Sequence, residues 1–203
     1  MRSSRSIFIG SVVFFVLVLV VGTLFQQNSA RFNGSLIKPA TPADDFQLTD
    51  QNGNAYRLSD QQGKVVVLFF GYTHCPDFCP VTLAQFRDLK ASLEEQSEQV
   101  EFVFITVDPE QDPVSRMKEY VDAFDPKLVG LTGTRSELEL VWKNYGVYQE
   151  KHTGHDETDT TVDHSTRTYL VDQQGKLLLT YPFGFETDKI VQDIHLLLDS
   201  GSG

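Results

Sequence analysis

The chain has little of several features that commonly carry function. It has only two cysteines and one tryptophan among 203 residues. No internal repeat and no long low-complexity tract is present, which argues against a repeat architecture. Basic residues are also scarce, with 17 Lys and Arg against 28 Asp and Glu, so that the formal net charge is −11. This charge argues against nucleic acid as a partner.

Charged side chains are entirely missing from residues 7–25. A run of this length spans a bilayer as a helix, which needs about 20 residues. A cleaved signal peptide has a shorter apolar core of about 7–15 residues, and Asn28-Ser29-Ala30 is a poor cleavage site. The sequence therefore predicts a short cytoplasmic N-terminus at 1–6, an uncleaved transmembrane anchor at 7–25 and a polar tether at 26–43. We expect a single-pass protein of a bacterial inner membrane, with the C-terminal domain in the periplasm.

Residues 44–203 are numerous enough for one domain with its own core. Turn, capping and hydrophobic patterns indicate a β-hairpin, then βαβα, then ββα. The marks of these elements are the hairpin turn Asn52-Gly53, strands at 64–70 and 101–107, helices after Cys79, Asp112-Pro113 and Thr134, a short strand at 128–131, the turn Gln174-Gly175 and a helix from Thr187. This order predicts an α/β, thioredoxin-like fold with a mixed central sheet and helices on both faces.

The two cysteines, Cys75 and Cys79, lie where the apolar strand at 64–70 gives way to a helical pattern. A helix N-terminus stabilises a thiolate, so the sequence predicts a lowered cysteine pKa. A structural disulfide is the simplest alternative, but closing so short a loop stabilises a fold little. The position therefore favours a redox-active pair, or a pair that holds one soft metal ion.

Five histidines are candidates for a third chemical group. His164 stands just before the strand at 168–172, where many thiol oxidoreductases of the thioredoxin-like fold carry a cis-proline, and this chain has Thr166 at the proline position. Two thiolates and one imidazole suit copper(I), or form a reactive pair with an adjacent base. His74 adjoins Cys75 and is a weaker candidate ligand. His152 and His155 lie in an acidic loop that offers at most an auxiliary metal site, and His195 accompanies the apolar stripe of the last helix.

Three segments resemble the Sco/SenC family of membrane-anchored copper proteins. They are Cys75 to Pro80, which resembles the family's C-x-x-x-C-P signature, Val107-Asp108-Pro109, which resembles its V-D-P segment, and Val162 to Ser165, which resembles its V-D-H-[ST] motif. The chain departs from the family pattern at Phe78 and Gln111 and in the acidic loop at 150–161. The resemblance implies that Cys75, Cys79 and His164 bind copper, as Cu(I) or Cu(II). It also implies a metallochaperone that assists assembly of the dinuclear CuA site of cytochrome c oxidase.

Two enzymatic interpretations compete with the metallochaperone. In the first, Cys75 and Cys79 act as a thiol–disulfide oxidoreductase that reduces the CuA-site cysteines of the oxidase subunit or takes part in redox signalling. Whether the chain is an enzyme depends on this choice. In the second, the chain is a peroxidase of the peroxiredoxin type, but Pro76 stands where that pattern requires Thr. Expected partners are the CuA-bearing oxidase subunit and other periplasmic copper chaperones or thioredoxin-like reductants.

Overall fold

The computed structural model describes residues 32–153, 160–164 and 166–200, and over 149–153 and 160–164 it describes the backbone alone. The anchor predicted at 7–25 lies outside these residues. Within the described part of the chain, no helix is long and apolar enough to cross a bilayer.

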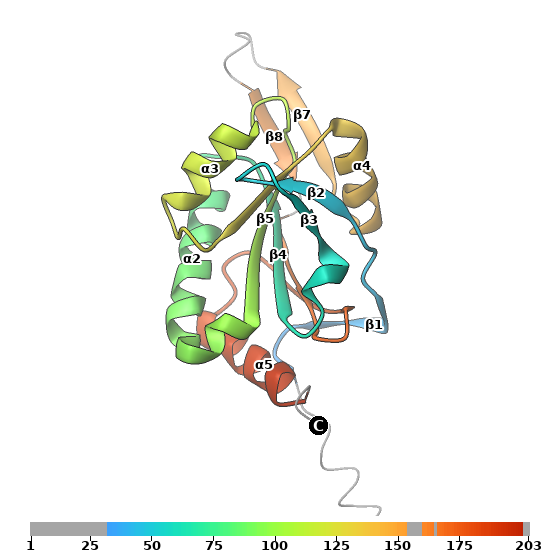
Figure 1. Cartoon of the computed structure of the whole chain (residues 1–203), viewed down its shortest axis with the longest axis vertical. Coiled ribbons are helices and arrows are strands. Elements are labelled where there is room, and N and C mark those ends of the chain that lie inside the picture. The colour runs from blue at the N-terminus through green and yellow to red at the C-terminus, as the bar shows by residue number, and fades with distance from the viewer. Residues whose placement is uncertain (1–31, 154–159, 165, 201–203) are drawn as a thin grey trace, which may run out of the picture. The chain divides into compact units, whose positions relative to one another are not determined.

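Eight strands form one mixed sheet in the order β1-β10-β9-β4-β5-β6-β2-β3 (Figure 1). Their bounds are β1 Ser35–Pro42, β2 Gln47–Asp50, β3 Ala55–Arg57, β4 Val65–Gly71, β5 Val100–Thr106, β6 Val129–Thr132, β9 Thr168–Val171 and β10 Lys176–Tyr181. β4 pairs in parallel with β5 and antiparallel with β9, and β5 pairs in parallel with β6. The predicted mixed sheet is therefore confirmed.

Helices connect these strands and complete the domain. Their bounds are α2 Phe78–Leu93, α3 Val114–Asp122, α4 Arg135–Asn144 and α5 Thr187–Ser200, with 3₁₀ turns η1 Leu58–Gln61 and η2 Glu94–Gln99. α4 begins with the predicted capping box, in which Thr134 accepts from the Glu137 amide and the Glu137 side chain accepts from the Thr134 amide. Gly146, with a φ of 63°, follows the helix as a left-handed C-terminal residue.

β4 lies in the middle of the sheet, between β9 and β5, and every one of its residues is buried. Successive side chains of a strand point to opposite faces of a sheet. On one face Phe69 meets Phe86 of α2, with ring centroids 6.5 Å apart. On the other face Phe70 meets Tyr145, which directly follows α4, at 5.7 Å. Helices therefore cover both faces of the sheet, as predicted, and α5 lies beside α2 (Figure 1).

The first strand begins inside the segment that the sequence predicted as a tether. Residues 26–43 were expected to be a polar connection, whereas Ser35–Pro42 form β1, which pairs antiparallel with β10. Most β1 side chains are exposed, so its apolar pattern is weak. Its place in the sheet comes from backbone pairing with the edge of β10, which a side-chain pattern does not reveal.

The flanks of the predicted acidic loop also pair through their backbones. β7 Gln149–Thr153 and β8 Thr160–His164 form a separate two-stranded antiparallel sheet in which Gln149 lies opposite His164. The expectation of a simple surface loop at 150–161 is wrong for these flanks. The pairing joins main-chain groups of the two strands, which the side-chain pattern of the sequence does not reveal.

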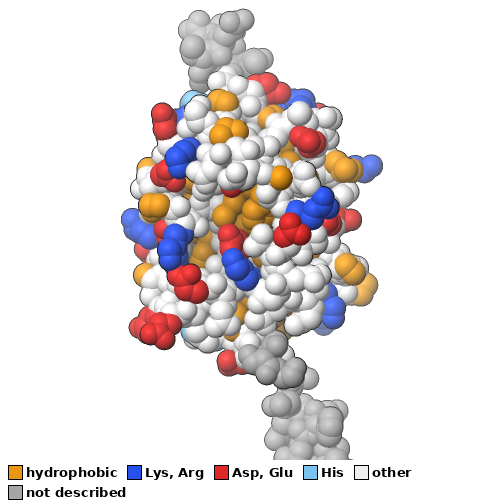
Figure 2. Space-filling model, in the orientation of Figure 1, with side chains coloured by type: hydrophobic (Ala, Val, Ile, Leu, Met, Phe, Trp, Pro, Cys, Tyr) orange, Lys and Arg blue, Asp and Glu red, His pale blue; other side chains and the backbone are white. Residues whose placement is uncertain are grey.

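Charged side chains of both signs are interspersed over the surface of the domain. Figure 2 shows acidic and basic groups next to one another on the face in view, without a continuous basic area. Ion pairs such as Lys90–Asp125 and Lys127–Glu98 account for part of this pattern.

Candidate functional site

The cysteine pair lies between the central strand and the helix that follows it. β4 ends at Gly71 and α2 begins at Phe78, so Cys75 belongs to the connecting loop and Cys79 is the second residue of the helix. Both cysteines are in the thiol form, with exposed fractions of 7% for Cys75 and 0% for Cys79. The two side chains are hydrogen-bonded to each other. The structure thus brings together the two residues that the sequence selected.

Gly71 allows the end of the central strand to pack directly against this pair. A Cβ atom at Gly71 would lie 2.6 Å from Cys79 Sγ and 2.7 Å from a ring carbon of Phe104. Contacts this short do not occur between real atoms, so any side chain at this position would displace the thiol or the ring. Cys79 can therefore occupy its observed position only because residue 71 is a glycine.

The pKa of Cys79 differs from the sequence prediction. The hydrogen bond with Cys75 and then burial raise the pKa of the Cys79 thiol well above its usual range. A helix N-terminus lowers a thiol pKa when the thiolate is exposed to it and to water. Here the sulfur is buried, so the cost of removing a thiolate from water exceeds the helix contribution. The prediction of a lowered pKa is wrong for Cys79.

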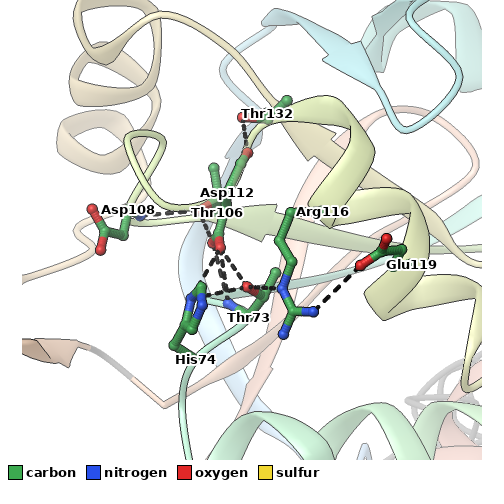
Figure 3. A network of polar contacts seen from close by, with 8 residues as sticks. All are labelled: Thr73, His74, Thr106, Asp108, Asp112, Arg116, Glu119 and Thr132. Atoms are coloured by element: carbon green, nitrogen blue, oxygen red, sulfur yellow. Dashed lines mark hydrogen bonds and ion pairs between the residues drawn. The ribbon is translucent and has the colours of Figure 1, made fainter. Parts of the chain in front are cut away.

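Asp112 is completely buried, and its side chain points toward Thr73 of the loop that carries Cys75 (Figure 3). Its carboxylate accepts hydrogen bonds from the Thr73 amide at 3.1 Å, from Thr73 Oγ1 at 2.6 Å and from Thr106 Oγ1 at 2.6 Å. Its main-chain carbonyl accepts from Thr132 Oγ1 at 2.8 Å. Thr106 ends β5 and Thr132 ends β6. The residue therefore joins the loop after β4 to the carboxyl ends of the next two strands.

The sequence placed Asp112 only at the start of a helix. The structure shows instead that Pro113 is the N-cap of α3 and that this cap makes no side-chain hydrogen bond. The Asp112 carboxylate turns away from the helix and toward the two threonines. An aspartate before a proline was a usable signal for a chain reversal, but it gave no sign of these distant partners.

Tyr120 of α3 brings a further polar atom toward the cysteines. Its hydroxyl is buried and, among the described residues, has no hydrogen-bond partner. Burial first, and then negative charge at Cys79 and Cys75, raise the pKa of this hydroxyl. Neither Tyr120 nor Thr73 is among the site residues predicted from the sequence. Tertiary packing brings both residues to the site, and no local sequence motif predicts this position.

The histidines are distributed unevenly around this site. His74 is next to Cys75, its side chain is 50% exposed, and its Nδ1 lies 3.2 Å from Thr73 Oγ1. The backbone of His164 ends β8, whereas its side chain is outside the described atoms. The same holds for the side chain of His152, and His155 lies wholly outside the described residues. His195 is half-buried in α5.

The described side chains alone do not complete a metal site. Within them, no group of three His, Cys, Asp or Glu residues is arranged to hold a metal ion. Two adjacent thiols are a soft donor pair that suits copper(I).

The comparisons with known proteins place the chain in a family. The SCO1/SenC family model matches residues 35–199. The chain belongs to the SCO1/SenC family. An SCO2-like protein of Rickettsia conorii is 37% identical over 135 residues, which are 66% of this chain and 66% of the relative. The chain thus spans just under two thirds of that relative's length.

Solved structures of this family share the fold. The copper-bound structure of Bradyrhizobium japonicum ScoI is 37% identical, with a TM-score of 0.72 over 78% of this chain and 100% of that chain. BsSco, described as a member of the Sco family of cytochrome c oxidase assembly proteins with a disulfide switch, is 26% identical, with a TM-score of 0.64 over 83% of this chain and 98% of that chain. These likenesses confirm the predicted thioredoxin-like fold for this SCO1/SenC member.

Proposed function

We propose that this chain is a copper-binding protein that assists assembly of the CuA site of cytochrome c oxidase. The observation that carries the proposal is the pair of adjacent thiols of Cys75 and Cys79 after the end of the central strand, which are hydrogen-bonded to each other. The copper-bound structure of a family member with 37% identity supports copper as the metal. Copper is the cargo of such a protein, and the thiols would release their protons to the solvent on binding it.

We propose His164 as the third ligand. The register of the sheet supports this choice, because Thr168 of β9 lies opposite Phe69 of β4. β9 runs antiparallel to β4, so its first residues lie at the end of the sheet where the cysteine loop leaves β4. His164 precedes Thr168 by only four positions in the chain. An imidazole nitrogen beside two thiolates makes a donor set suited to copper.

We further propose that residues 7–25 anchor the chain in a bacterial inner membrane, with the copper-binding domain in the periplasm. The support is the uncharged run of spanning length in the sequence. The partner would then be the CuA-bearing subunit of the oxidase, reached on the same side of the membrane. Labelling Cys75 in intact cells with a membrane-impermeant thiol reagent tests the orientation, and protection of the reduced thiol until the cells are broken would contradict it.

A thiol–disulfide oxidoreductase is the second candidate. It is favoured by the hydrogen bond between the Cys75 and Cys79 side chains, since two thiols in contact are placed to form a disulfide. The disulfide switch described for BsSco supports the same chemistry. In this role the two sulfurs would reduce the oxidase cysteines before copper arrives, and a third ligand would be dispensable.

An anaerobic copper(I) titration of the reduced full-length chain separates the two functions. His164→Ala is expected to weaken copper(I) binding at least tenfold, or by about 1.4 kcal/mol. His195→Ala is the matched control, because it removes a histidine of α5 and should leave the affinity within twofold. Cys75→Ser or Cys79→Ser should abolish tight binding. Unchanged copper affinity and normal oxidase assembly in cells carrying His164→Ala would favour the oxidoreductase.

A further inference from the structure

The loop that carries Cys75 is held by one buried side chain. The exposed fraction of Asp112 is 0%. Its two carboxylate oxygens accept hydrogen bonds from the amide and the hydroxyl of Thr73 and from the hydroxyl of Thr106. The amide of Asp112 also donates to the carbonyl of Asp108 at 3.0 Å. The backbone of Asp112 is therefore held by the turn after β5, and its carboxylate is held by the loop after β4.

Thr73 passes this constraint to the residues around the cysteine. Its hydroxyl has one hydrogen, which goes to the Asp112 carboxylate at 2.6 Å, and two lone pairs. Arg116 Nε donates to this hydroxyl at 3.1 Å. His74 Nδ1 lies 3.2 Å from the same oxygen, and it donates to this oxygen in the tautomer that carries the proton on Nδ1. The Thr73 hydroxyl thus contacts Asp112, Arg116 and His74 (Figure 3).

This arrangement fixes the backbone up to the metal-binding thiol. Thr73 is held by both its amide and its side chain, and the Cys75 amide donates to the Tyr72 carbonyl at 3.2 Å, which closes the turn. We propose that Asp112, acting through Thr73, is the positioning residue that keeps the Cys75 sulfur against the Cys79 sulfur for copper binding and disulfide formation. This inference deepens the proposed function and rests on it.

Charge alone would act in the opposite direction. Two thiolates that bind one copper(I) ion carry a net charge of −1, so a nearby carboxylate opposes their formation. If Asp112 acted only through its charge, Asp112→Asn would tighten copper binding. If it acts by positioning, the same substitution weakens binding, because an amide cannot accept from all three donors that the carboxylate serves.

The test measures two properties of the reduced full-length chain. The first is copper(I) affinity by anaerobic competition, and the second is the reduction potential of the cysteine pair in glutathione buffers. In the second measurement glutathione disulfide takes two electrons and two protons from the dithiol, which yields one Cys75–Cys79 disulfide and two glutathione thiols. This measurement needs no metal, so it tests the inference even if copper proves not to bind.

Four variants define the comparison: Asp112→Asn, Thr73→Val, Thr73→Ser and Asp193→Asn. Asp112→Asn removes the charge and part of the acceptor set, and Thr73→Val removes the hydroxyl while it keeps the shape of the side chain and the Asp112 charge. Asp193→Asn is the matched control, because Asp193 is also completely buried and also accepts from backbone amides and a hydroxyl, but it shares no hydrogen-bond partner with Asp112.

Asp112→Asn and Thr73→Val are both expected to weaken copper(I) binding about 10- to 100-fold, as loss of an outer-shell partner typically does. Both should make the pair about tenfold harder to oxidise, a rise in potential of about 30 mV. Thr73→Ser should restore both properties, and Asp193→Asn should leave both within twofold. Tighter copper binding in Asp112→Asn with no effect of Thr73→Val would overturn the inference. An equal effect of Asp193→Asn would also overturn it.

Discussion

Two buried aspartates hold two different parts of this domain. Asp112 fastens the cysteine loop to the ends of β5 and β6. Asp193 of α5 fastens the segment before β1, where it accepts from the amides of Asn33 and Gly34, and it also accepts from Tyr181 Oη at 2.8 Å. Both carboxylates have an exposed fraction of 0%.

The two sites differ in what lies beyond the carboxylate. The partners of Asp193 are Asn33 and Gly34, which precede β1, and Tyr181 of β10. The partners of Asp112 lead through Thr73 to His74 and to the loop of Cys75, where the chemistry is expected. The buried carboxylate of Asp193 therefore contributes to stability alone, whereas that of Asp112 also sets the geometry of the cysteine loop. Substitutions that separate folding from copper binding follow from this difference.

The largest expected effect on stability is that of Asp193→Ala. The substitution leaves two backbone amides and the Tyr181 hydroxyl without their acceptor, and each unsatisfied buried group costs about 1–3 kcal/mol. We expect the free energy of unfolding to fall by about 3–5 kcal/mol in urea titrations, with copper affinity unchanged in the folded fraction. The exposed Asp199 of the same helix is the control, and Asp199→Ala should change stability by less than about 0.5 kcal/mol. A loss below about 1 kcal/mol for Asp193→Ala would show that solvent readily replaces this carboxylate.

Substitution of two glycines should have an intermediate effect on stability. Gly34 lies near Asp193, and Gly71 lies at the cysteine loop. A Cβ at Gly34 would lie 2.5 Å from the Tyr181 ring, and a Cβ at Gly71 would lie 2.6 Å from Cys79 Sγ. We expect Gly34→Ala and Gly71→Ala each to cost about 1–3 kcal/mol, because the packed neighbours must move.

Only Gly71→Ala should also weaken copper binding and shift the reduction potential of the cysteine pair. Paired thermal melts and copper titrations check this expectation, with the exposed Ser35→Ala as a neutral control. Equal losses of copper affinity in both glycine variants would contradict the separation of the two regions.

The smallest expected effect on stability concerns the exposed ion pair between Arg135 and Glu110, which follows β5. Arg135 donates to Glu110 at 2.6 Å, and this hydrogen bond lowers the pKa of Glu110 to about 2. Since the folded-state pKa lies below the unfolded value, the stabilisation is present above about pH 4.5 and is lost as the pH falls toward 2.

Both side chains are more than a third exposed, so solvent screening limits the contribution to about 1 kcal/mol or less. Arg135→Gln should therefore lower stability by that amount at pH 6, and the difference from the parent chain should shrink between pH 4.5 and pH 2. Urea titrations at these pH values measure it. Glu139→Gln, which affects a longer 3.8 Å pair with Arg135, is the control, and a difference independent of pH would rule out the ionised Glu110 as its source.

The sequence alone determined the order of the central elements and the cysteine pair. The strand at 64–70 reads as buried because it is apolar on both faces, and the structure confirms it as β4. The capping box at Thr134 and the hairpin turn at Asn52-Gly53 were readable because their hydrogen bonds join residues only a few positions apart. The choice of Cys75 and Cys79 rested on an equally local feature, a strand that gives way to a helix.

Tertiary structure alone decided the features that depend on distant partners. β1 is a strand because β10 pairs with its backbone, and the pKa of Cys79 is raised because its sulfur is hydrogen-bonded to Cys75 and buried beneath the end of β4. Asp112 is 39 positions from Thr73 in the chain, yet the two side chains are 2.6 Å apart. The contact between Asp112 and Thr73 leaves no periodic signal in the sequence, because the two residues meet only where the parallel strands β4 and β5 bring their carboxyl ends to one edge of the sheet.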